Sequence, residues 1–345
     1  MGSEMCIRDR IMPVRNEADF VERAVTSVLN NDYPAEKMEV IVVDGISDDG
    51  TRETVGRLSR QDDRVKMLDN PQQIVPTAMN IGLRAARGDV FIRVDGHAEI
   101  PPDFVTRSVE CLRDHPDAWV VGGRIETVAD DFIGRAVASA MRSPVGVGNA
   151  RFRLGDYEGW VDTVAFGAHH RWVPERIGYF DEELVRNQDD EFNLRIILAG
   201  GKIWMSKSIR STYFSRASLG KLWRQYFQYG FWRIRTLQKH KRPAAFRQLA
   251  PLLLVLSLIL LGLAGLLWRP ARIALAVEAG LYVLTLAGGA VDVGRRSGWK
   301  FVTTSPLIFG ILHFAYGLGS MWGGLRFCVL RGCRMRKPQQ IQLSR

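Results

Sequence analysis

Acidic residues are absent from a long stretch of this sequence. Between Phe192 and Val277 there is no Asp or Glu, and residues 192–345 hold 2 acidic against 24 basic side chains, whereas residues 1–191 hold 35 acidic against 23 basic. This imbalance indicates two parts of different character, the second facing an anionic partner. A hydrophobic content of 46% excludes a disordered chain.

Cysteine is scarce, and the four cysteines form neither a C-x-x-C pair nor a zinc-type cluster with histidine. A disulfide scaffold is therefore excluded, and a reduced compartment is expected. The first ten residues lack the apolar core of a secretory signal, so the acidic half should stay in the cytosol. The apolar segment Ile11–Val14 is typical of the end of a buried strand, whose beginning should also be apolar, but the residues before it are polar and charged. Residues 1–10 are therefore expected to be a non-native or disordered leader.

Apolar runs are concentrated in the basic half. Ala250–Trp268 is 19 residues long without a charge, enough to cross ~30 Å of hydrocarbon. Ile273–Gly294 is expected to be a second span. Thr304–Phe327 either crosses or re-enters, because a third crossing would place a basic tail outside, against the positive-inside tendency. Glu278, inside the second segment, is either functional or packed against another helix.

Leu219–His240 combines aromatic and basic residues at helical spacing. This pattern is typical of an amphipathic helix at a membrane interface, and the alternative is a helix packed on the soluble part. Because basic residues flank the apolar segments, membrane lipids are the expected anionic partner and nucleic acid is not.

Residues 11–125 alternate β-branched runs with amphipathic stretches, which predicts an α/β fold with a mostly parallel sheet and helices on both faces. The expected strands are Ile11–Val14, Val40–Val43, Val90–Val94, Trp119–Gly123 and Val161–Phe166, and the expected helices include Ala18–Asn30, Pro76–Arg87 and Asp189–Ala199.

Two of these strands lead directly to a carboxylate, Asp44 after one and Asp95 after the other. Ligands of open α/β sheets bind at the carboxyl ends of the strands. A single Asp there is often only a turn or helix cap, but four polar groups follow one another in order, which is more specific. They are residues 13–17 (PVRNE), 43–51 (VDGISDDGT), 93–97 (RVDGH) and 187–191 (NQDDE).

This ordered set resembles the family 2 glycosyltransferases, which have the GT-A nucleotide-diphospho-sugar transferase fold, and among them the membrane-attached bacterial exopolysaccharide enzymes of the succinoglycan type. The resemblance covers Ile11–Tyr213. It implies that Asp44 accepts hydrogen bonds from the uracil or ribose of the donor. The full set of donor nucleotide-binding residues that it implies is Pro13, Arg15, Glu17, Asp44, Asp49, Asn80, Arg87 and Asp95.

Asp95 and His97 stand where the family carries Asp-x-Asp, so the resemblance implies a divalent metal, Mn²⁺ or Mg²⁺. Two ligands on one loop suit a cation that bridges the phosphates of a nucleotide diphosphate. Imidazole in place of an oxygen ligand favours Mn²⁺. The alternative is that His97 is an ordinary loop histidine.

Asp189 matches the family's catalytic base, with Gln188 in place of a glutamate and Asp190 beside it. The base would take the proton of the acceptor hydroxyl, and inversion at the anomeric carbon follows. Without the upstream motifs, Asp189 would be a helix cap. His169, His170 and Arg171 lie in the expected acceptor-facing segment and are either auxiliary residues or structural ones.

The expected protein is a metal-dependent inverting glycosyltransferase of the bacterial inner membrane, multi-pass, with its catalytic domain facing the cytoplasm. It would move a hexose from a UDP-linked donor to a lipid-linked saccharide in exopolysaccharide biosynthesis, with other exopolysaccharide assembly proteins as partners. The alternatives are a polyprenyl-phosphate glycosyltransferase and a non-catalytic membrane scaffold. The expected domains are residues 11–215 (catalytic), 216–247 (interface helix), 248–330 (transmembrane) and 331–345 (basic tail).

Overall fold

The computed structural model describes residues 9–215 and 218–330, and the chain divides into two compact units. The first consists of Met1–Thr127 and Arg151–Phe214, and the second of Val128–Ala150 and Ser215–Arg345. The predicted domain of residues 11–215 is therefore interrupted, because residues 128–150 belong to the second unit.

The expected leader and the expected basic tail fall largely outside the described residues, which exclude 1–8 and 331–345. Residues 9 and 10 are described. Asp9 and Arg10 are buried at the start of the first strand, so this strand begins two residues earlier than predicted.

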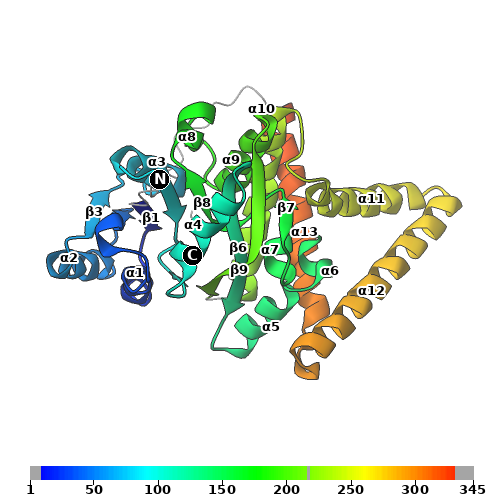
Figure 1. The fold of residues 1–345 in the computed structure, drawn as a ribbon. Coiled ribbons are helices and arrows are strands. Elements are labelled where there is room, and N and C mark those ends of the chain that lie inside the picture. The colour runs from blue at the N-terminus through cyan, green and yellow to red at the C-terminus, as the bar shows by residue number, and fades with distance from the viewer. Residues whose placement is uncertain (1–8, 216–217, 331–345) are drawn as a thin grey trace. The chain divides into compact units, whose positions relative to one another are not determined.

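The first unit is built on one nine-stranded sheet in the order β3-β2-β1-β4-β8-β6-β9-β5, with β7 paired to β9 (Figure 1). The strands β1, β2, β3 and β4 run parallel, and β8 joins β4 in the antiparallel direction. The strands are β1 (Asp9–Val14), β2 (Glu39–Asp44), β3 (Val65–Asp69), β4 (Val90–Arg93), β5 (Ala98–Glu99), β6 (Ala118–Val128), β7 (Gly159–Val161), β8 (Ala165–His170) and β9 (Lys202–Phe214).

Helices cover both faces of this sheet, which is why the central strands are apolar on both sides. Met12 and Val42 belong to a core that includes residues of α1, α2 and α4. Ile11 and Ile41 face the other way, into a core with α3, α8 and α9. The helices of this unit are α1 (Val21–Leu29), α2 (Thr51–Gln61), α3 (Val75–Ala85), α4 (Phe104–Asp114), α7 (Arg151–Leu154), α8 (Trp172–Ile177) and α9 (Gln188–Leu198).

The predicted α/β fold is confirmed. The sheet is mixed rather than mostly parallel, because β4 with β8, β6 with β8, β5 with β9 and β7 with β9 all pair in the antiparallel direction. One strand is also misplaced. The expected strand Val161–Phe166 is wrong, because β7 ends at Val161 and β8 begins only at Ala165. Between them the hydroxyl of Thr163 accepts a hydrogen bond from Asn193 Nδ2 at 2.9 Å. The apolar run thus passes through a turn that is held by a side chain of α9.

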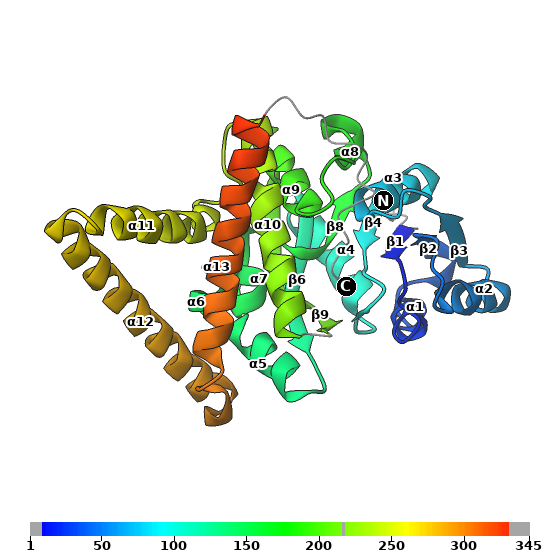
Figure 2. The same ribbon diagram turned by 180° about the vertical axis from the view of Figure 1, so that it is seen from behind.

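In the second unit, α10 and α13 pack together along their length (Figure 2). Glycines allow the contact: a Cβ atom on Gly230 would lie 2.0 Å from Tyr316 O, and one on Gly319 would lie 2.0 Å from Phe227 O. Such close backbone approach is typical of helices that associate through small residues. The helices of this unit are α5 (Phe132–Ala140), α6 (Pro144–Val147), α10 (Leu219–His240), α11 (Ala250–Gly265), α12 (Arg269–Ser297) and α13 (Ser305–Gly324).

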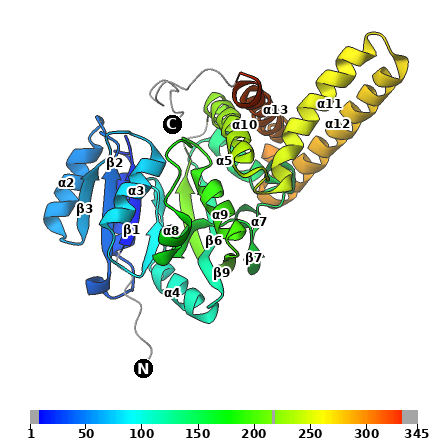
Figure 3. The ribbon, with the colours of Figure 1, turned by 90° about the horizontal axis from the view of Figure 1, so that it is seen from above.

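Two helical stretches in the described part of the chain are long and apolar enough to cross a membrane by length and composition, Phe246–Gly265 and Arg269–Ser297. Figure 3 shows α11 and α12 extending together away from α10 and α13. Glu278 of α12 accepts a hydrogen bond from Ser257 of α11 at 2.5 Å. Of the two alternatives for Glu278, the structure therefore favours packing against another helix.

Candidate active site

Three loops meet at the carboxyl ends of β1, β2 and β4, because these strands run parallel and are neighbours. Val14 pairs with Asp44 at the ends of β1 and β2, and β4 lies on the other side of β1. A Cβ atom on Gly96 would lie 2.7 Å from Val14 Cγ1, and one on Gly45 would lie 3.1 Å from Arg15 Cβ, so glycine permits both close approaches. The strand order reverses at β1, which is where open α/β sheets bind ligands.

Hydrogen bonds join the loop after β1 to the loop after β2. The backbone N–H of Glu17 donates to Thr51 Oγ1 at 2.8 Å, and that of Ala18 donates to Asp49 Oδ2 at 3.1 Å. Asp49 also accepts from Thr51 Oγ1 at 2.6 Å. Burial alone would raise the pKa of Asp49, but these hydrogen bonds lower it below its ordinary value. Asp49 therefore shapes this turn, and its part in donor binding stays a prediction.

Asp44 is fully buried at the end of β2. Its carboxylate accepts hydrogen bonds from the backbone N–H of Ser47 at 3.0 Å and from Arg52 Nη1 at 2.7 Å. The same Arg52 nitrogen lies 2.8 Å from Asp69. The Asp44 carboxylate is thus already hydrogen-bonded to the loop after β2 and to α2. A nucleobase or ribose that contacts Asp44 would have to bond to the same carboxylate.

Left-handed backbone is frequent around this edge. Asn16, Ile46 and Asn187 have φ angles of 55°, 55° and 61°, and they lie in the loops after β1 and β2 and at the start of α9. Asparagine tolerates this region, but a β-branched isoleucine is strained there. Such strain is concentrated at ligand sites.

Asp95, which follows β4, is paired with an arginine of its own strand. Arg93 Nε lies 2.8 Å from Asp95 Oδ1, and both side chains are largely buried, with 17% and 18% exposed. Burial would raise the pKa of Asp95, but the charges of Arg93 and His97 lower it. Asp95 is therefore an ionised carboxylate in a mostly enclosed position.

Asp189 lies on the first turn of α9 and faces the same arginine. Arg93 Nη1 is 3.9 Å from Asp189 Oδ2, so Arg93 stands between the predicted metal ligand and the predicted base. The Asp189 side chain is 58% exposed. Desolvation by the surrounding protein and the like charge of Asp190 raise its pKa, and Arg93 opposes them. A carboxylate with a raised pKa that is open to solvent can accept a proton from an incoming hydroxyl group.

His97 faces the loop after β1. Its Nδ1 lies 3.0 Å from Glu17 Oε1, and its ring packs edge-on against Tyr213 with the ring centroids 4.6 Å apart. Burial would lower the pKa of His97, but Glu17 and Asp95 raise it above its ordinary value. The imidazole is thus held on two sides, and one of them is a carboxylate.

Asp95 and His97 fit the predicted divalent cation. One carboxylate oxygen and one imidazole nitrogen on a single turn, completed by diphosphate oxygens and water, suit a cation that a nucleotide brings with it. Metal-binding histidines usually donate their second N–H to a carboxylate, and Glu17 offers one. Within the described residues no group of three or more His, Cys, Asp or Glu side chains could hold a metal ion by itself, so the ligand's own oxygens are needed.

The other residues expected at this edge lie near it with different exposure. Pro13 and Arg15 are partly exposed where β1 ends. Gln188 is buried at the start of α9, whereas Asp190 is partly exposed. The backbone N–H of Asp190 donates to Asp189 Oδ1 at 2.9 Å, which holds the candidate base in place. Their roles in binding stay predictions.

Arg87 and Asn80 do not belong to this site as predicted. The backbone N–H of Arg87 donates to Asp9 Oδ2 at 2.7 Å, at the start of β1, so its backbone lies where the parallel strands begin and not where they end. Asn80 is buried and bonds with its amide to Phe180 at 2.9 Å and Glu182 at 2.8 Å. Its contribution is to position the segment that leads to α9.

The segment His169 to Arg171 is also misplaced by the prediction, because β8 runs antiparallel to β4 and pairs Val90 with His170. His169 is buried, stacks on Phe91 with ring centroids 4.7 Å apart and donates from Nδ1 to Gly167 O at 2.8 Å. Burial lowers its pKa to about 4, so it is a neutral core residue. Burial also lowers the pKa of His170. Of the two alternatives for His169, these contacts favour the structural one.

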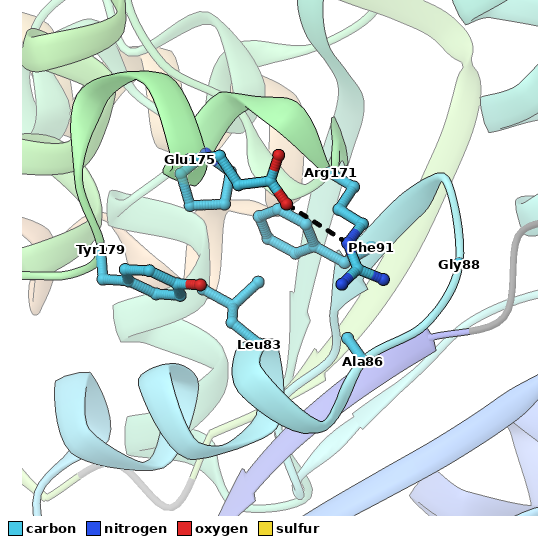
Figure 4. A pocket seen from close by; sticks show the side chains of 8 residues that line it. Leu83, Ala86, Gly88, Phe91, Arg171, Glu175 and Tyr179 are labelled. Atoms are coloured by element: carbon cyan, nitrogen blue, oxygen red, sulfur yellow. Dashed lines mark hydrogen bonds and ion pairs between the residues drawn. The ribbon is translucent and has the colours of Figure 1, made fainter.

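His170 and Arg171 lie at the far edge of the sheet, where the backbone N–H of Arg171 donates to Asp89 O at 2.8 Å. A small pocket at this edge is shown in Figure 4. It is lined by Leu83, Ala86, Gly88, Phe91, Arg171, Pro174, Glu175 and Tyr179, and Arg171 is paired there with Glu175 at 3.5 Å. Neither Asp95 nor Asp189 lines this pocket. The structure therefore does not bring His170 and Arg171 together with the residues around Arg93.

Sequence reasoning missed the roles of Arg93 and Tyr213. Arg93 lies inside the RVDGH motif, and a basic residue at that place in an otherwise apolar strand was the available signal, since such a charge needs a partner. Tyr213 lies at the end of β9, a strand that was not predicted. Only the folded chain brings it to His97.

The comparisons with known proteins agree with this fold. The sequence profile of glycosyl transferase family 2 matches residues 10–160. The chain is 34% identical over 249 residues to the succinoglycan biosynthesis protein ExoA of Rhizobium meliloti, covering 70% of this chain and 73% of that protein. The chain therefore belongs to family 2 of the glycosyltransferases.

A second relative and a solved structure extend the comparison. A dolichyl N-acetyl-alpha-D-glucosaminyl phosphate 3-beta-D-2,3-diacetamido-2,3-dideoxy-beta-D-glucuronosyltransferase of Methanococcus voltae is 28% identical, covering 64% of this chain and 70% of that protein. The solved structure of the mannosyltransferase PcManGT from Pyrobaculum calidifontis, in complex with GDP-Man and Mn²⁺, matches with a TM-score of 0.60 and 21% identity over 92% of this chain and 87% of that one. The predicted GT-A fold is thus confirmed.

Proposed function

We propose that this chain is an inverting hexosyltransferase that moves a sugar from a UDP-linked donor to a lipid-linked saccharide during bacterial exopolysaccharide biosynthesis. The observation that carries the proposal is that Asp95 and Asp189 face one guanidinium, that of Arg93, from opposite ends. The leaving diphosphate and the attacking hydroxyl bond to the same sugar carbon. A group that serves the diphosphate, Asp95, and a group that serves the hydroxyl, Asp189, therefore have to lie about one sugar ring apart.

Asp189 acts as the base in this proposal. Its carboxylate takes the proton of the acceptor hydroxyl while the hydroxyl oxygen bonds to the anomeric carbon and the bond from that carbon to the donor phosphate breaks. A single displacement inverts the anomeric centre. The raised pKa of Asp189 improves its strength as a base, and its exposure leaves room for an acceptor.

The diphosphate leaves as an anion, so the site has to stabilise negative charge. Arg93 supplies a fixed positive charge beside Asp95. Asp95 and His97 would hold a divalent cation, Mn²⁺ or Mg²⁺, which when bound neutralises the phosphates. Pro13 and Arg15, with the turn that Asp44 and Asp49 shape, would enclose the nucleoside.

The lipid-linked acceptor is inferred from the second unit and from the relatives. Lys241 and Arg242 precede the first candidate span, and the second ends with Arg295 and Arg296 and is followed by Lys300. Two crossings with these basic ends inside satisfy the positive-inside tendency and keep the catalytic unit on the cytoplasmic side. A protein that is confined to the bilayer meets a membrane-bound acceptor at a raised effective concentration. The name of the Methanococcus voltae relative describes a dolichyl-linked sugar phosphate as its acceptor.

The test is transfer of label into lipid. Membranes that contain the protein are incubated with radiolabelled UDP-hexoses and GDP-mannose, each with Mn²⁺, Mg²⁺ or EDTA, and the lipid extract is counted. A lengthened lipid-linked oligosaccharide supports the proposal. A phosphodiester-linked monosaccharide would instead identify a polyprenyl-phosphate glycosyltransferase, and no labelled lipid with any donor would leave a non-catalytic scaffold.

A further inference from the structure

The contact between Glu17 and His97 joins two motifs that lie far apart in the sequence. Glu17 follows β1 and His97 follows β4, and Glu17 Oε1 lies 3.0 Å from His97 Nδ1. The side chains are only 18% and 24% exposed, respectively. A Cβ atom on Gly96 would lie 3.3 Å from Glu17 Cγ, so the glycine between Asp95 and His97 leaves space for the glutamate.

Both partners are held in place from outside the pair. The backbone N–H of Glu17 is anchored to Thr51 Oγ1 at 2.8 Å, which in turn is fixed by Asp49. Tyr213 of β9 packs edge-on against the imidazole. Because the backbone of Glu17 and the ring of His97 are each held by other residues, the two side chains are kept in position to contact each other.

The chemistry of imidazole gives this contact a consequence. A carboxylate at Nδ1 keeps the proton on that nitrogen, and the lone pair of the neutral ring then lies on Nε2. This is the form of histidine that binds a metal ion, and a carboxylate behind the ring raises its basicity as a ligand. Asp95, two residues earlier on the same turn, supplies an oxygen ligand.

We propose that Glu17 is a positioning residue for the cation site: it orients His97 and fixes its tautomer so that Nε2 binds the divalent cation that accompanies the nucleotide diphosphate. This inference rests on the proposed function. It replaces the role implied by the family resemblance, in which Glu17 lines the nucleotide pocket, because the glutamate carboxylate is engaged with His97.

Binding of Mn²⁺, measured without turnover, tests the proposal. The full-length protein in nanodiscs is titrated with Mn²⁺ in the presence of saturating UDP, and free Mn²⁺ is followed by electron paramagnetic resonance. Glu17→Gln should weaken Mn²⁺ binding ~10- to 100-fold. Asp19→Asn removes the same charge from the same loop and should leave Mn²⁺ binding unchanged. UDP affinity in EDTA should be the same in all three proteins.

The same Glu17 substitution in a His97→Asp protein distinguishes a loss of His97 orientation from a general distortion of the loop. His97→Asp places an oxygen ligand that needs no tautomer, so adding Glu17→Gln to His97→Asp should change Mn²⁺ binding less than ~2-fold. The nitrogen coupling of bound Mn²⁺ in electron spin echo spectra should be present in the wild type and absent in His97→Asp.

Three results would overturn the inference. Unchanged Mn²⁺ binding in Glu17→Gln with weakened UDP binding in EDTA would return Glu17 to the nucleotide pocket and leave the proposed transferase intact. An equal loss in both backgrounds would show a role that does not act through His97. A wild-type protein that transfers sugar but binds no Mn²⁺ would remove the cation site while the transferase stands.

Discussion

Asp95 and Asp189 face each other across one guanidinium: Arg93 Nε lies 2.8 Å from Asp95, and Arg93 Nη1 lies 3.9 Å from Asp189. The two acidic residues come from the loop after β4 and the first turn of α9. Burial would lower the pKa of Arg93, but the charges of Asp95 and Asp189 raise it. Arg93 therefore stays positively charged, and its charge offsets the repulsion between the two carboxylates.

Arg93→Met should reduce kcat/KM ~100-fold or more, because it removes a positive charge from beside the leaving diphosphate and leaves two acidic groups uncompensated. Arg93→Lys should recover part of the loss, since it restores the charge without the planar group that reaches both partners. Steady-state kinetics on a fixed donor measure the effect. Arg107→Met, on the exposed face of α4, is the control. Wild-type kcat/KM in Arg93→Met would refute this role.

His169 should make the first unit less stable in mild acid. Its pKa falls from 6.5 in the unfolded chain to about 4 in the fold, so the unfolded state binds the extra proton and stability is lost as the pH drops through 6.5. Between about pH 7.5 and about pH 5 this loss is about 2 kcal/mol. His169→Phe keeps a ring against Phe91 and cannot titrate. Denaturant unfolding at both pH values should show a smaller pH dependence in this variant, and an identical dependence would count against a neutral buried ring.

The strain at Ile46 should be measurable as stability. Ile46 has a φ of 55°, so Ile46→Gly should raise the free energy of unfolding by ~1 kcal/mol. Gly50 is the opposite case, with a φ of 99° and nothing within 4 Å of an added Cβ, so Gly50→Ala should lower it by ~1 kcal/mol through the backbone alone. Thermal unfolding of both variants checks the pair. Destabilisation by Ile46→Gly would mean that the isoleucine contributes more by contact than it loses by strain.

Packing of α10 on α13 depends on glycines at the contact, where a side chain would clash with the backbone of the other helix. Gly319→Ala would put a Cβ atom 2.0 Å from Phe227 O and should destabilise the second unit by ~2 kcal/mol. Gly310→Ala lies on the same helix with nothing within 4 Å of the new atom, and should be neutral or stabilising by ~0.5 kcal/mol. Thermal unfolding in nanodiscs compares the two, and equal effects would contradict the tight packing.

Periodicity in the sequence predicted much of the fold. The helix Leu219–His240 was predicted with the bounds that the structure has, because its apolar and basic residues alternate at helical spacing. The strands before Asp44 and Asp95 were recognisable as short β-branched runs. The strand β9 and the assignment of residues 128–150 to the second unit were not predicted, since both depend on contacts between distant parts of the chain.

Motifs predicted the candidate site less evenly, because the edge of the sheet at which a residue lies depends on strand direction. Asp95 and Asp189 come close together as expected, on either side of Arg93, whose role was not expected. In contrast, β8 runs antiparallel to β4 and takes His170 and Arg171 to the other end of the strands. Arg87 precedes β4 and therefore lies where this strand and β1 begin, at the same end as His170 and Arg171. The contact of Glu17 with His97 could not be inferred from either motif alone.

Asp189→Asn tests the central claim most directly. The protein in membranes is given labelled donor and divalent cation, and transfer to the lipid extract is measured beside equilibrium binding of UDP. We predict that this variant binds UDP as the wild type does and transfers sugar ~10³-fold more slowly, because an amide cannot take the acceptor's proton. Transfer at the wild-type rate by Asp189→Asn would contradict the account.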